Sequence, residues 1–192
     1  MKTLRNLFAV IGLLALLGAG GLYLKFNEAM SGFDPQAVPV YREMLGHVLE
    51  SRSAAEATVW KMQVAEGLSV EDVEQTMKFV ANEHNIANVG ELPLSKDVEA
   101  KSGGAYRFVK IYMFCNSLTA ARMLDYSDAF SAYLPCRITM VEDKRGRLWL
   151  YALNMDLMIY GGEPLPPELK EESIEVKEII LDIMKRGASG EF

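Results

Sequence analysis

An uncharged run of 18 residues, Leu7 to Leu24, is the feature that most constrains how this chain can fold. A helix rises about 1.5 Å per residue, so this run just spans a hydrocarbon core of about 30 Å. Lys2 and Arg5 precede the run, and positive charges at this position keep the N-terminus in the cytoplasm. We therefore expect a single N-terminal membrane segment that sends the rest of the chain across the membrane.

This segment fits two alternatives, an uncleaved anchor and a cleaved signal peptide. Gly18 and Gly20 resemble the small residues of a cleavage site, but the sequence stays apolar beyond them as far as Leu24. An uncleaved anchor is therefore the prediction. In a bacterium, the chain would be a single-pass inner-membrane protein with its C-terminal domain in the periplasm.

The remaining chain is long enough for one globular domain, because half of the 192 residues are apolar. We expect an anchor or signal segment at 1–26, a linker and juxtamembrane helix at 27–57, and a domain at 58–192. The formal net charge of -6 argues against nucleic-acid binding, which relies on clustered Lys and Arg. The expected partners are the membrane, through residues 7–24, and a protein of the cell envelope.

The domain sequence alternates between strand-like and helix-like patterns. Ser69 offers an N-cap for a helix at 70–83, and Gly146 suits the turn of a hairpin between strands at 136–141 and 148–154. We also expect strands at 58–65, 86–94 and 106–115, helices at 40–56, after Asn116 and at 168–186, and an exposed loop at 96–105. This order predicts an α+β fold with a mostly antiparallel sheet and helices packed on one face.

Two cysteines mark neighbouring strand ends. Cys115 closes one expected strand and Cys136 opens the next, so both thiols should lie at the same end of the sheet. Alternation puts Cys115 on one face with Met113, and Cys136 on one face with Met140. If both faces are covered by helices, both sulfurs face the core. A disulfide, two buried free thiols, and a redox or metal role are then all open alternatives.

The sequence offers soft metal ligands but no sharp metal motif. Eleven methionines are present, and thioether and thiolate groups suit copper, so Cys115, Cys136, Met113 and Met140 form a candidate copper set. Methionine more often fills irregular core space, which is the plainer reading. Without the copper alternative, no cofactor is expected.

The sequence gives little support for catalysis. It contains no G-x-S-x-G motif, no phosphate-binding glycine loop and no spacing typical of a catalytic triad. Asp156 is the one carboxylate placed near the strand ends, beside Asn154 and Met155. The sequence leaves enzymatic activity open and favours a non-enzymatic role, with no catalytic residue assigned.

The stretch from Tyr112 to Met155 resembles the domain-of-unknown-function 302 family. The resemblance rests on Cys115-Asn116 at a strand end, Leu134-Pro135-Cys136 at the next strand, and Val141-Glu142-Asp143 with Gly146 in the hairpin. It implies a compact α+β fold similar to the TATA-binding-protein-like architecture, and no established activity. Ser117 departs from the family pattern, which often has proline there.

Two functional hypotheses follow for the strand ends. The first is a membrane-tethered periplasmic accessory module that binds a partner or small ligand near Cys115, Asn116, Pro135, Cys136 and Asp156. The alternative is a thiol-redox or copper-handling protein that uses Cys115 and Cys136.

Overall fold

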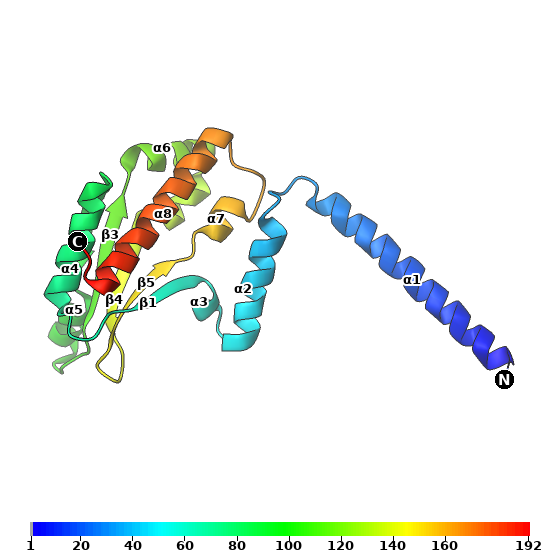
Figure 1. Cartoon of the computed structure of the whole chain (residues 1–192), viewed down its shortest axis with the longest axis horizontal. Helices are drawn as coiled ribbons and strands as arrows, with labels where there is room; N and C mark the ends of the chain where they lie inside the picture. The colour runs from blue at the N-terminus through cyan, green and yellow to red at the C-terminus, as the bar shows by residue number, and fades with distance from the viewer. Residues whose placement is uncertain (1) are drawn as a thin grey trace.

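The computed structural model describes residues 2–192 and consists of one isolated N-terminal helix and an α+β domain (Figure 1). Helix α1 runs from Lys2 to Met30 and projects away from the domain. Between Leu4 and Met30 it is long and apolar enough to cross a membrane, and this part is exposed. It is therefore compatible with a membrane anchor or a signal sequence. Met1, the first residue of the predicted anchor, lies outside the described residues.

The domain is built on one sheet of five antiparallel strands in the order β1-β5-β4-β3-β2. The strands are β1 (Val59–Gln63), β2 (Ala87–Leu92), β3 (Val109–Cys115), β4 (Cys136–Glu142) and β5 (Leu148–Leu153). The β4–β5 hairpin is the one expected from Gly146, which has a φ of 78° in the turn. The pairing of β2 with β3 is irregular, with a register shift between Asn88 and Gly90. The predicted α+β fold with an antiparallel sheet is confirmed.

Two helices, α4 (Val70–Glu83) and α8 (Pro167–Ser189), pack against the sheet and form one core with it. Ser69 begins α4 with the expected cap: its side chain accepts the N–H of Asp72, whose carboxylate accepts the N–H of Ser69. Close packing of the two helices depends on Gly187 of α8. A Cβ atom there would lie 2.6 Å from Cγ of Met77, so only glycine fits without a shift.

The remaining helices of the domain lie around this core: α2 (Ala37–Ser51), α3 (Ala54–Ala57), α5 (Leu94–Ser102), α6 (Ser117–Tyr126), the 3-10 helix η1 (Asp128–Tyr133) and α7 (Asp156–Tyr160). The expected single helix at 40–56 is two helices, because Arg52 adopts a φ of 55° between them.

The predicted exposed loop at 96–105 is wrong. Most of this segment forms α5, which ends at Gly103 in the left-handed conformation. The helix is stabilised by packing on β3: Ser95 is buried and its hydroxyl donates to the carbonyl of Val109 at 3.3 Å. The polar composition of the segment concealed this contact, because tertiary packing outweighs weak local propensity.

The segment that joins α1 to the domain is fixed in place by polar contacts. Asp34 is 2 % exposed and forms a salt bridge with Lys170 of α8. The N–H of Asp34 donates to the carbonyl of Gly162 at 2.8 Å, and the hydroxyl of Tyr41 donates to the carbonyl of Gly161 at 2.6 Å. We call these three contacts the juxtamembrane clamp. They hold the start of α2 against the connection between α7 and α8.

Candidate functional site

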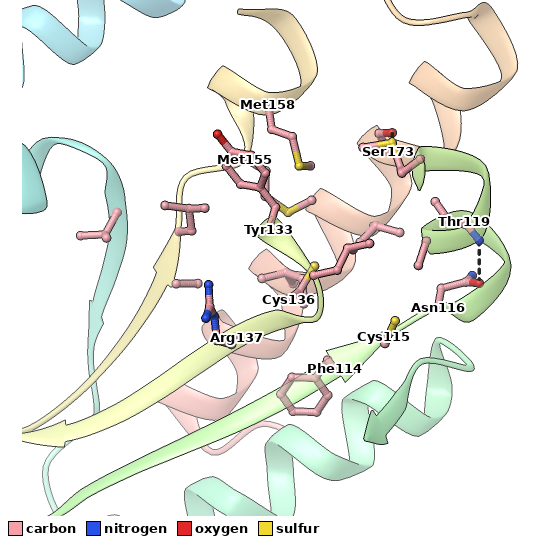
Figure 2. Close-up of a pocket in the computed structure, with 18 of the residues that line it drawn as sticks. Phe114, Cys115, Asn116, Thr119, Tyr133, Cys136, Arg137, Met155, Met158 and Ser173 are labelled. Atoms are coloured by element: carbon pink, nitrogen blue, oxygen red, sulfur yellow. Dashed lines mark hydrogen bonds between the residues drawn. The ribbon is translucent and has the colours of Figure 1, made fainter. Parts of the chain in front are cut away.

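A cavity of about 310 Å³ lies at the end of the sheet where β3 ends and β4 begins (Figure 2). We call it the strand-end cavity. Residues of β3, β4 and β5 line it together with residues of α6, η1, α7 and α8. Most of its lining is apolar: Phe114, Met123, Leu134, Met155, Met158, Val176 and Ile180 contribute to its walls. A hollow of this size is at the lower end of the range for small-molecule sites.

Asn116 sets the position of α6 above the cavity. Its side-chain oxygen accepts the N–H of Leu118 at 3.1 Å and the N–H of Thr119 at 3.3 Å. Figure 2 shows the bond with Thr119. These bonds satisfy two of the free N–H groups at the start of the helix, so the helix begins directly at the strand end. The helix expected after Asn116 is therefore present and is capped by this residue, which also lines the cavity.

Cys115 and Cys136 both line the cavity, at the neighbouring ends of β3 and β4 (Figure 2). The expectation that they share a face is wrong. The register pairs Phe114 with Cys136, so these two side chains lie on the helix-covered face. Cys115 is the next residue along β3 and therefore lies on the opposite face. Alternation within each strand was predicted correctly, but the register between the strands was not.

The two cysteines are free thiols in this structure, which gives no support to the disulfide alternative. The physical reason is the register, which directs the two side chains to opposite faces. Burial raises the pKa of the Cys115 thiol, and burial with the nearby Cys115 raises the pKa of Cys136 to about 11. A reactive cysteine needs a lowered pKa, so these surroundings do not favour thiol chemistry.

The four residues of the candidate copper set do not converge. Met113 and Cys115 lie on the open face of the sheet, whereas Cys136 and Met140 lie on the helix-covered face, where Met140 is fully buried. Within residues 2–192, no group of three or more His, Cys, Asp or Glu side chains is arranged to hold a metal ion. The arrangement does not favour copper binding by this set.

Pro135 and Asp156 lie beside the cavity and are not lining residues. Pro135 stands between Leu134 and Cys136, which do line it. Asp156 begins α7 and binds Lys177 of α8, with 2.7 Å between carboxylate oxygen and Nζ. Its role in the structure is to hold α7 against α8, and α7 brings Met158 to the cavity wall.

Several lining residues were not among the sequence candidates. Met158 was missed because α7 is only five residues long and follows a strand without a cap signal.

Ser173 and Val176 come from α8, more than thirty residues along the chain from Cys136. Both lie in the helix expected at 168–186, but no local pattern shows that this part of the helix lies over the strand ends. Arg137 and Tyr133 flank the Leu134-Pro135-Cys136 motif and could have been found as its neighbours.

Comparison with known proteins agrees with this fold. The family model described as "Domain of unknown function DUF302" matches residues 60–187. A solved structure, "Crystal structure of uncharacterized conserved protein DUF302 from Bacillus stearothermophilus", superposes with a TM-score of 0.55 at 14 % sequence identity. The match covers 67 % of this chain and 97 % of that one. At this identity the likeness shows the fold alone. No curated protein matches the chain.

Proposed function

The chain belongs to the DUF302 family, and from this premise we propose that it is a membrane-tethered module that binds a mainly apolar small molecule in the strand-end cavity. The single observation that carries the proposal is the cavity itself, about 310 Å³ with mostly apolar walls at the strand ends. An apolar hollow is poorly hydrated, since a buried water needs two to four polar partners. An apolar ligand would therefore gain buried surface there without displacing well-bound water.

The surroundings support binding more than catalysis. The side-chain oxygen of Asn116 and the hydroxyl of Ser173 are used within the fold: the Asn116 oxygen caps α6, and the hydroxyl of Ser173 donates to the carbonyl of Leu169 at 2.6 Å. The thiols of Cys115 and Cys136 are held neutral by burial, which raises the pKa of each. These groups can orient a ligand, and none is activated as a base or nucleophile.

Photoreactive alkyl probes test this proposal on the full chain in phosphatidylcholine vesicles. We expect a medium-chain probe with a diazirine to cross-link to cavity residues, as located by mass spectrometry. Ala120→Trp would fill the cavity from α6 and should abolish these cross-links. Leu118→Trp is the matched control, because Leu118 lies on the same helix but is 73 % exposed and outside the cavity. Labelling that avoids the cavity in the unmodified chain would refute the proposal.

We further propose that the domain lies in the periplasm. The support is the sequence of α1, with Lys2 and Arg5 before an uncharged run that is long enough to span a bilayer. Alkaline phosphatase fused to the C-terminus should be active, because this enzyme needs an oxidising compartment. A stably expressed but inactive fusion would mean that the domain stays in the cytoplasm.

A further inference from the structure

Arg137 is the feature of the strand-end cavity that the proposed function leaves unused. It lies on the open face of the sheet, next to Cys136 in β4 and opposite Met113 in β3. It is exposed and contributes to the cavity lining. Among residues 2–192, no carboxylate forms a salt bridge with it, although the chain contains 26 acidic residues. Its positive charge is therefore available to a ligand.

The lining of the cavity carries a single charge, and this charge is positive. Within the described residues, Arg137 is the one charged side chain of the lining, and no Asp, Glu or Lys accompanies it. The chain as a whole is acidic, with a formal net charge of -6, whereas the lining of this cavity contains no acidic side chain. Because no acidic side chain of the lining competes for the guanidinium of Arg137, a carboxylate or phosphate oxygen of a ligand can bind it.

The cavity also has distinct polar and apolar parts. Thr139 and Tyr151 are paired in the sheet and lie on the same open face as Arg137, so two hydroxyl groups accompany the guanidinium. On the helix-covered side, Met155, Val176 and Ile180 offer only apolar surface. Beyond the Phe114–Cys136 pair the strands diverge, because Cys115 leads into α6 and Leu134 arrives from η1. The cavity borders both faces at this point.

We infer that the ligand is a single-chain amphiphile with one anionic head group, held by Arg137 on the open face with its apolar chain inside the strand-end cavity. This inference rests on the proposed function and adds the chemical class of the ligand. The hydroxyls of Thr139 and Tyr151 donate to the head group, and the thioether and aliphatic side chains enclose the tail. Because α1 can place the domain beside a bilayer, the amphiphile can arrive from the membrane or from solution.

A matched pair of photoreactive probes tests the head-group assignment on the full chain in phosphatidylcholine vesicles. The pair is a medium-chain diazirine carboxylic acid and the corresponding primary alcohol, which share the same chain and differ in the head group, an anionic carboxylate in one and a neutral hydroxyl in the other. We expect the acid to label the cavity about tenfold more strongly than the alcohol, as charge-assisted hydrogen bonds to arginine allow. Arg137→Gln should bring the acid to the level of the alcohol, and Arg137→Lys should restore part of the preference.

Arg145→Gln is the control variant, because it removes the same charge from the hairpin turn outside the cavity and should leave labelling unchanged. Equal labelling by acid and alcohol, or an acid preference that survives Arg137→Gln, would overturn the inference while the proposed function stood. Cavity labelling by neither probe would overturn both. Each probe is supplied in two separate experiments, once within the vesicle membrane and once from solution on albumin. The experiment in which the cavity is labelled more strongly identifies the source of the ligand.

Discussion

Two cysteine residues show how one strand register decides the chemistry open to a side chain. Cys115 and Cys136 end neighbouring strands but lie on opposite faces, and burial is the first cause that raises the pKa of each thiol. We predict that reductant leaves the melting midpoint unchanged. A disulfide worth about 3 kcal/mol would shift the midpoint by several degrees on reduction, so a shift of that size would contradict the register. Native alkylation at neutral pH should be slow at both residues and slowest at Cys136.

Among the secondary-structure elements, α4 is joined to β2 and β3 by a ring of four charges. Glu74 lies 2.6 Å from Lys78 and 2.8 Å from Lys110, while Glu91 lies 2.7 Å from Lys78 and 2.6 Å from Lys110. Burial raises the pKa of Glu91, but hydrogen bonds to Lys110 and Lys78 outweigh it and lower the pKa to about 2. The ring therefore contributes stability when Glu91 is ionised.

The sign of its pH dependence follows from this lowered pKa. The folded pKa lies below the unfolded value, so the contribution is complete above about pH 4.5 and is lost as the pH falls towards 2. Glu91→Gln should lower the free energy of unfolding at pH 7 by about 1–2 kcal/mol and flatten its fall between pH 4.5 and 2. Urea unfolding at several pH values measures both effects. The exposed Asp97–Lys101 pair supplies the control, since Asp97→Asn should cost less than about 0.5 kcal/mol.

Elements with strong local signals could be predicted from the sequence, and those defined by distant contacts could not. The cap at Ser69, the cap at Asn116 and the turn at Gly146 each act within a few residues, so they marked their elements correctly. Helix α5 depends on packing against β3, which no local pattern records. The candidate site divides in the same way: Cys115, Asn116 and Cys136, which the sequence placed at the strand ends, line the cavity. The wall from α8 and the register that separates the thiols required the folded chain.

At the scale of the whole molecule, the juxtamembrane clamp joins the N-terminal helix to the domain. Burial raises the pKa of the Asp34 carboxyl, but hydrogen bonds from Lys170 and from the N–H of Gln36 outweigh it and keep the pKa below its usual value. Asp34→Asn should weaken the clamp, because the change removes this negative charge. We predict faster amide hydrogen exchange in α2 and unchanged exchange in β4, measured by mass spectrometry on the full chain. Asp125→Asn, an exposed change on α6, should alter neither. Exchange in α2 that stays unchanged in Asp34→Asn would show that the clamp contributes nothing.

The clamp also limits how far the domain can travel. Asp34 follows the last residue of α1, Met30, by four positions, and an extended chain spans at most about 3.5 Å per residue, giving a reach of roughly 14 Å. With α1 held in a bilayer, the domain would stay within a thin layer next to the lipid surface and would not reach the solution beyond that layer. Encounters with anything dissolved in that bilayer would then become a search in two dimensions, governed by lateral diffusion and by the number of copies per unit of membrane area.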